Sequence, residues 1–214
     1  MSKKERKLTP AEQRRKAAYQ ELSAALEQQG YEKRELTIGV LAANLGSLLL
    51  TFPLILALIW AYYLIHPEGS AAPTLLSSAF FLPLLLALIV LHEGIHGLTW
   101  ACFVPGHLRS VQFGIIWKSL NPYCTCSQPM KRWQYVLGSL MPTLVLGFGL
   151  SAAAVALGRL WLLAIAGLML LAGGADLLIA LRLVFFRSRG RPLLCCDHPY
   201  ACGLAVFQKS KPQP

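Results

Sequence analysis

The amino-acid sequence predicts an all-α integral membrane protein with four transmembrane helices. The chain of 214 residues is 55% hydrophobic and only 14% charged, with a mean hydropathy of +0.51, whereas soluble globular domains carry about 25% charged residues. Twenty Lys and Arg against ten Asp and Glu give a net charge of +10, but these charges occur in short blocks between long uncharged stretches. This distribution is typical of a membrane protein with basic loops and argues against a soluble globule, a disordered chain or a nucleic-acid-binding surface.

Four stretches are long enough to cross a bilayer, which requires about 20 mostly apolar residues. They cover about residues 38–65, 75–104, 133–158 and 160–186. Lys and Arg concentrate in residues 1–35, in the loop of residues 105–132 and in the tail from Arg187 onward. The positive-inside rule therefore predicts that both termini and this loop lie in the cytoplasm. We expect a multi-pass protein of the plasma (cytoplasmic) membrane of a bacterium.

The expected organisation is a basic N-terminal segment, a four-span domain and a short tail. Their boundaries are residues 1–35, 36–207 and 208–214. In the first segment, Thr9, Pro10 and Glu12 have the spacing of a helix N-cap, N1 and N3, which predicts a helix over residues 10–29. This helix either lies on an anionic membrane surface or is a solvated helix that precedes the first span.

The loop of residues 105–132 contains a run rich in β-branched and aromatic residues at 111–117. Such a run between turn-forming residues is typical of a short strand or hairpin. The six cysteines lie at or beyond the predicted cytoplasmic ends of the spans, where reduced thiols are expected. A second metal site formed by cysteines is the alternative, although the sequence contains no C-x-x-C spacing.

The second span carries the sequence His92-Glu93-Gly94-Ile95-His96. Residues four apart lie on one face of a helix, so both imidazoles can bind one zinc ion, and Glu93 is close enough to polarise a water molecule at that ion. Ionisable side chains are costly inside a span, and a divalent cation would compensate for that cost. The alternative is a solvated pair of histidines at the cytoplasmic interface.

Asp176 is the candidate third ligand, because a zinc site with two histidines needs another protein ligand and Asp176 is the only acidic residue in the other three spans. Counted from the cytoplasmic span ends at about 1.5 Å per residue, Asp176 lies level with the midpoint between His92 and His96. The small residues 172–175 would allow close helix packing. The alternative is a buried carboxylate that pairs with Arg182 or caps backbone.

Together these motifs resemble the putative zincin peptidase family, formerly a domain of unknown function, which is similar to the site-2 proteases. The resemblance covers about residues 36–207. It rests on the histidine motif and on Tyr123-Cys124-x-Cys126, Gly173-Gly174-Ala175-Asp176 and Asp197-His198-Pro199. It implies an intramembrane zinc metalloprotease in which His92, His96 and Asp176 bind Zn²⁺ and Glu93 is the general base.

The predicted function is therefore hydrolysis of peptide bonds near the cytoplasmic face. The expected partners are a membrane protein or peptide substrate and the lipid bilayer, and no nucleic acid is expected to bind. The 111–117 segment is a candidate for holding the substrate extended by β-augmentation. Asn121 is a candidate oxyanion donor, or else a turn residue, and His198 is a candidate partner of a metal ligand.

Two alternatives have a different function. One is a catalytically silent zinc-binding scaffold (a pseudoprotease), against which the intact Glu93 argues, since a scaffold needs no base. The other is a metal transporter, which would need several polar residues along a path, whereas the spans contain a single polar cluster.

Overall fold

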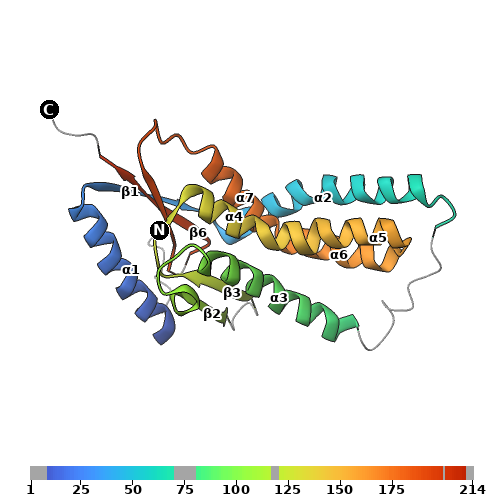
Figure 1. Ribbon diagram of the computed structural model, residues 1–214, viewed down its shortest axis with the longest axis horizontal. Coiled ribbons are helices and arrows are strands. Elements are labelled where there is room, and N and C mark those ends of the chain that lie inside the picture. The colour runs from blue at the N-terminus through green and yellow to red at the C-terminus, as the bar shows by residue number, and fades with distance from the viewer. Residues whose placement is uncertain (1–8, 70–80, 117–120, 200, 211–214) are drawn as a thin grey trace, which may run out of the picture.

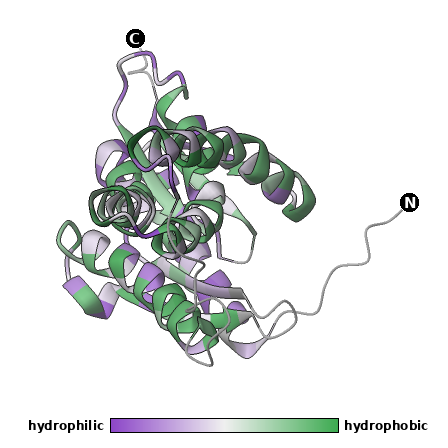
Figure 2. Cartoon of the chain, turned by 90° about the vertical axis from the view of Figure 1, so that its right-hand side faces the viewer, coloured by the Kyte–Doolittle hydropathy of each residue, from purple (hydrophilic) through white to green (hydrophobic). Residues whose placement is uncertain are grey.

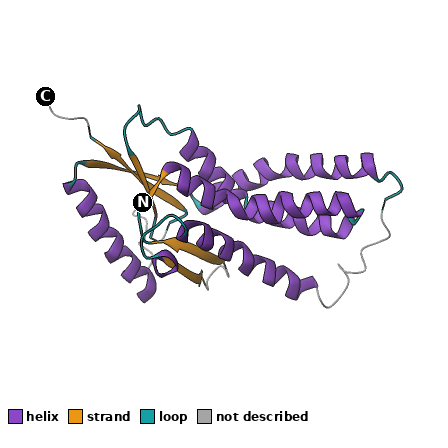
Figure 3. Cartoon of the chain, in the orientation of Figure 1, coloured by secondary structure: helices purple, strands orange, loops and turns teal. Residues whose placement is uncertain are grey.

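The structure is a computed structural model that describes residues 9–69, 81–116, 121–199 and 201–210. A bundle of long helices extends from one end of the molecule, and all strands lie with α1 at the other end (Figures 1 and 3). The helices are α1 (Pro10–Gln28), α2 (Val40–Ile65), α3 (Phe81–Ala101), the 3-10 helix η1 (His107–Ser110), α4 (Arg132–Pro142), the π-helix η2 (Thr143–Gly149), α5 (Leu150–Leu157), α6 (Leu160–Ala172) and α7 (Gly174–Val184). The strands are β1 (Tyr31–Thr37), β2 (Val111–Ile116), β3 (Asn121–Cys126), β4 (Met130–Lys131), β5 (Leu193–Asp197) and β6 (Gly203–Lys209).

Three helices are long and apolar enough to cross a membrane: α2, α3 and the continuous helix Arg132–Leu157, which comprises α4, η2 and α5. A fourth span would consist of α6 and α7, which are bent by 48° relative to each other. Hydrophobic residues occur along most of the helical surface (Figure 2), and large apolar side chains such as Leu49 and Val90 are exposed there. These features agree with a membrane protein, and the helix bounds lie close to those predicted, apart from residues 75–80, which lie outside the described residues.

The all-α prediction is wrong, because the structure contains two antiparallel sheets as well as the helices. The larger sheet has the strand order β1-β6-β5-β4. Its longest pairing runs from Tyr31 opposite Lys209 to Thr37 opposite Gly203, so it joins the two ends of the chain. Local hydrophobic periodicity does not reveal such pairing, because each strand is short and its partner is far away in the sequence. The domain boundaries predicted at residues 35 and 207 fall inside β1 and β6.

The smaller sheet is the hairpin of β2 and β3, paired from Val111 opposite Cys126 to Ile116 opposite Asn121. It confirms the strand predicted in the loop between the second and third spans, except for residue 117, which lies outside the described residues. The hairpin packs beside the end of α3 (Figure 1). This position brings its backbone close to the histidine motif.

The first helix, α1, begins as predicted, with a capping box in which the Glu12 backbone N–H donates to Thr9 Oγ1 (3.3 Å) and the Thr9 backbone N–H donates to the Glu12 carboxylate (2.8 Å). Its apolar side packs against the larger sheet, where Leu26 meets Phe207 and Cys196. This side of the helix is therefore covered by protein rather than by a membrane surface.

A hydrophobic core joins the ends of the helices to the larger sheet. It combines residues from α3, α4, α7 and the strands, among them Trp100, Tyr135, Leu183, Cys195 and Val206, which are at most 4% exposed. Because this core connects the two parts of the molecule, the sheets hold the helix ends in fixed positions around the candidate site.

Candidate metal centre

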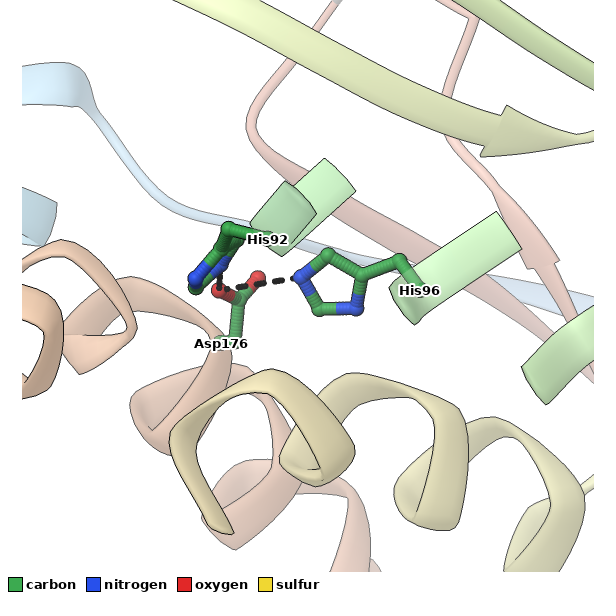
Figure 4. Close-up of side chains that lie close together, drawn as sticks. All are labelled: His92, His96 and Asp176. Carbon is green, nitrogen blue, oxygen red and sulfur yellow. Dashed lines mark hydrogen bonds and ion pairs between the residues drawn. The ribbon is translucent and has the colours of Figure 1, made fainter. Parts of the chain in front are cut away.

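Two histidines from α3 and one aspartate from α7 meet where the helices approach the sheets. Figure 4 shows the Asp176 carboxylate between the two imidazole rings. Its Oδ2 lies 3.4 Å from Nε2 of His92 and 3.4 Å from Nε2 of His96. The histidine side chains are 7% and 5% exposed, which contradicts the alternative of a solvated pair. The Asp176 carboxylate oxygen is thus equally distant from the two histidines, as expected for a residue level with the midpoint between them.

Asp176 lies in the first turn of α7, directly after the break between α6 and α7. The free N–H groups and the dipole at a helix N-terminus favour a carboxylate. The sequence predicts a continuous fourth span here, and the break is the feature that it does not reveal. A Cβ at Gly174 would come within 2.7 Å of Ser47 on α2, so the small residues also allow close packing of α7 against α2.

The three side chains fit a zinc ion. Tetrahedral zinc with ligands at about 2.0–2.1 Å places neighbouring ligand atoms about 3.3–3.4 Å apart, which matches both nitrogen–oxygen distances. One ligand atom from each residue lies within 4.8 Å of the other two. Two imidazoles and a carboxylate form a donor set that catalytic zinc uses, with a further position left for water or substrate.

His96 is held in the orientation that a metal ligand requires. Its Nδ1 lies 2.8 Å from the carbonyl oxygen of Gly138, and since a carbonyl only accepts, Nδ1 carries the proton and Nε2 keeps its lone pair for a metal. The Trp100 ring stacks on the imidazole at 5.2 Å and 19°. Any side chain at Gly138 would overlap this indole, so glycine is required there.

Glu93 follows His92 on α3 and is half-buried. The backbone amide of Cys124 on β3 lies within hydrogen-bonding reach of its carboxylate. The hairpin therefore covers the side of α3 that carries Glu93, next to the three candidate ligands. This arrangement is what a general base requires, because it must reach a water molecule that is bound at the metal.

A cavity of about 150 Å³ is lined by Asp176, one of the three candidate ligands. Its polar lining comes from Asp176, Ser139 and Tyr135 on the helices and from Thr125, Asp197 and His198 on the strands and the β5–β6 turn. A polar cavity of this size accommodates water molecules or one side chain of a peptide.

Residues 85–189 match the model of a family described as "Putative zincin peptidase". The matched segment begins within α3 and extends beyond α7, and it includes Glu93 and all three candidate ligands. No curated protein and no solved structure gives a match. The family description indicates a zinc metallopeptidase, and the chemistry of His92, His96 and Asp176 agrees with zinc.

Asp197 on β5, beyond the matched segment, organises the side of the site that faces the strands. Its Oδ1 accepts from the Tyr135 hydroxyl at 2.6 Å, and its Oδ2 accepts from the Cys126 backbone N–H at 2.7 Å. Burial raises the pKa of Asp197, and the two hydrogen bonds oppose this shift. The side chain thus connects β5, β3 and α4. In the sequence it is visible only within the Asp-His-Pro motif, which supports the family resemblance without indicating this role.

Two further predicted residues remain candidates only. Asn121 is the first residue of β3, opposite Ile116, and its side chain lies outside the described part of the structure. His198 lies after β5, where its Nδ1 accepts from the Ala201 backbone N–H at 2.9 Å, and it lines the cavity together with Asp176. Burial lowers the pKa of His198. The predicted roles of these two residues stay predictions.

All six cysteines are free. Burial raises the pKa of Cys126 to about 11 and that of Cys195 to about 12, so these thiols are protonated at neutral pH. Among the residues that the structure describes, His92, His96 and Asp176 are the only group of three or more side chains placed to hold a metal. The alternative of a second metal site at the cysteines is therefore not supported.

Proposed function

We propose that the protein is an intramembrane zinc metalloprotease that hydrolyses peptide bonds of membrane protein substrates near the cytoplasmic face. The observation that carries the proposal is the meeting of His92, His96 and Asp176 inside two apolar helices, with Glu93 beside them. Ionisable side chains within spans are costly and mark functional sites. The family match over the same residues supports peptidase chemistry.

The depth of the site supports cleavage close to one membrane face. His96 lies five residues before the end of α3 and Asp176 eight before the end of α7, about 8 and 12 Å from these helix ends. Both ends face the strands and α1 (Figure 1). The basic segments of the chain gather at this end, which under the positive-inside rule is the cytoplasmic one. Water then reaches the site from the cytoplasm.

Each residue has a distinct task in this proposal. Zinc in a site of this kind makes water more acidic and polarises a carbonyl group. His92, His96 and Asp176 hold the ion. Glu93 accepts a proton from the attacking water as the new carbon–oxygen bond forms, and it returns that proton to the departing amide nitrogen as the carbon–nitrogen bond breaks.

The β2–β3 hairpin is the proposed substrate platform. β3 pairs with β2 on one edge, and at its other edge the Cys124 amide faces Glu93. A peptide that joins this edge as an additional strand would be held extended beside the candidate metal ligands. Peptidases require an extended substrate, because a helical peptide bond is covered by its own side chains and hydrogen bonds.

The first test is the zinc content of the purified full-length protein in detergent, measured by elemental analysis. We expect about one zinc per chain in the wild type and loss of zinc in His96→Ala and Asp176→Ala. A folded wild-type protein without zinc would overturn the proposal.

The second test uses Glu93→Gln, which keeps the shape of the side chain but removes the base. This variant should retain zinc and cleave fluorescein-labelled casein at least about 100-fold more slowly than the wild type. Equal cleavage by both proteins would refute the role of Glu93. A zinc-loaded wild type that cleaves neither casein nor a reconstituted transmembrane peptide would favour the scaffold over the protease.

A further inference from the structure

Two buried polar atoms beside the candidate metal centre have no hydrogen-bond partner in the described structure. They are Nδ1 of His92 and Oγ1 of Thr143, in residues that are 5% and 2% exposed. Buried polar atoms are nearly always paired, so two unpaired ones at one place call for a physical reason.

Both atoms lie next to the break between α6 and α7. A Cβ at Gly173 would overlap the Thr143 hydroxyl, and it would come within 3.5 Å of Cε1 of His92, the carbon between the two ring nitrogens. The Thr143 hydroxyl and this edge of the His92 imidazole therefore both lie close to the position that a Gly173 Cβ would occupy. Because glycine has no side chain, nothing at this position separates them.

The local helix geometry explains why the Thr143 hydroxyl lacks a local partner. Thr51 on α2 and Thr99 on α3 each donate to the carbonyl four residues earlier, at 2.8 and 2.7 Å. Thr143 is the first residue of the π-helix η2, where the backbone spacing differs from that of an α-helix. Single π-helical turns within α-helices are frequent at functional sites.

We propose that Thr143 is a positioning residue of the metal centre, and that its hydroxyl oxygen accepts a hydrogen bond from the Nδ1–H group of His92. This inference rests on the metal site of the proposed function. Binding of Nε2 to a metal leaves the proton on Nδ1 and so creates the donor that the hydroxyl needs. The Gly138 carbonyl already serves His96 in this way, and with Thr143 both rings have an outer partner that directs Nε2 toward Asp176.

The test compares three variants of the full-length protein in detergent. Thr143→Val removes the hydroxyl while keeping the shape, Thr143→Ser restores a hydroxyl, and Thr51→Val is the matched control. Thr51 is also buried in a candidate span, at 1% exposure, but its hydroxyl is satisfied by its own helix. Zinc affinity is measured by competition with a chromophoric chelator, and ligand geometry by the visible absorption of the Co²⁺-loaded protein.

We expect Thr143→Val to bind zinc about 10- to 100-fold more weakly and to change the Co²⁺ spectrum. Thr143→Ser should recover both properties, and Thr51→Val should match the wild type. Wild-type affinity and spectrum in Thr143→Val would overturn the inference, as would an equal loss in Thr51→Val. If valine prevents folding, Thr143→Ala tests the same loss. A folded wild type that binds no zinc would overturn the proposed function itself, so the two failures are distinguishable.

Discussion

Replacement of Asp197 by alanine tests whether this carboxylate holds the sheets to the helices. The substitution removes the acceptor of two short hydrogen bonds, from Tyr135 and from the Cys126 backbone amide. Both donor residues are buried, at 3% and 4% exposure, so water does not replace the lost partner. Each buried donor left unsatisfied costs about 1–3 kcal/mol. We therefore expect the contact between the strands and the helix ends, here called the junction, to be destabilised by about 2–6 kcal/mol.

Thiol labelling of the native protein measures this loss directly. Cys126, Cys195 and Cys196 are at most 4% exposed, so they react only when the junction opens, whereas the exposed Cys102 reacts at once. Local opening of this kind follows its own free energy. A destabilisation of about 2 kcal/mol raises the open fraction about 30-fold, and the labelling rate of the three buried thiols should rise by at least that factor.

Two further variants show whether a faster labelling rate is due to the loss of the Asp197 hydrogen bonds. Glu32→Ala removes an exposed carboxylate from β1, the edge strand of the same sheet, and should leave the rates unchanged. Asp197→Asn keeps an oxygen for the Cys126 amide and should show a smaller increase than alanine. Labelling of Asp197→Ala within twofold of the wild type, as seen by mass spectrometry of each cysteine, would refute the reasoning.

Two further predictions concern the break between α6 and α7 and the turn between β5 and β6. Gly173→Ala should weaken zinc binding at least about tenfold, because its Cβ would overlap the Thr143 hydroxyl. Gly167→Ala, inside α6, meets only ordinary contacts, at 3.7 Å, and should bind zinc normally in the same chelator competition. Burial lowers the pKa of His198 below its usual value of about 6.5, so the neutral form stabilises the fold above that pH and the stability is lost as the pH falls through the folded pKa. The melting temperature should therefore fall between pH 7.5 and pH 5.5 by more in the wild type than in His198→Asn, and equal pH dependence would contradict this.

Local sequence patterns predicted most of the helical architecture. Apolar runs and the capping residues Thr9 and Glu12 mark helix bounds, because both depend on neighbours within a few residues. The same holds for the pair His92 and His96, whose common face follows from a spacing of four. Asp176 could be predicted because so few acidic residues occur in the spans that depth and chemistry left one candidate.

The four-stranded sheet could not be predicted in the same way. β1 is rich in charged residues and lies on an edge of that sheet, so it has no alternating apolar pattern. Its register is set by pairing with β6, which comes from the other end of the chain. The roles of Asp197 and Thr143 depend on that assembly. Asp197 accepts a hydrogen bond from the Cys126 backbone amide on β3. The hydroxyl of Thr143 is unpaired because of a π-helical turn, which residue propensities do not reveal.

The broken fourth span links the fold to the proposed chemistry. A carboxylate ligand gains from the free N–H groups of a helix start, but a helix can start inside a membrane only where protein covers the exposed backbone. Here Ser47 and Thr143 lie directly against Gly174 and Gly173, so α2 and the third span provide that cover. In the proposed protease the break must also lie near one membrane face, because hydrolysis consumes water. The sheets that close this end therefore have two tasks, since they hold the helix ends together and place the Cys124 amide beside Glu93.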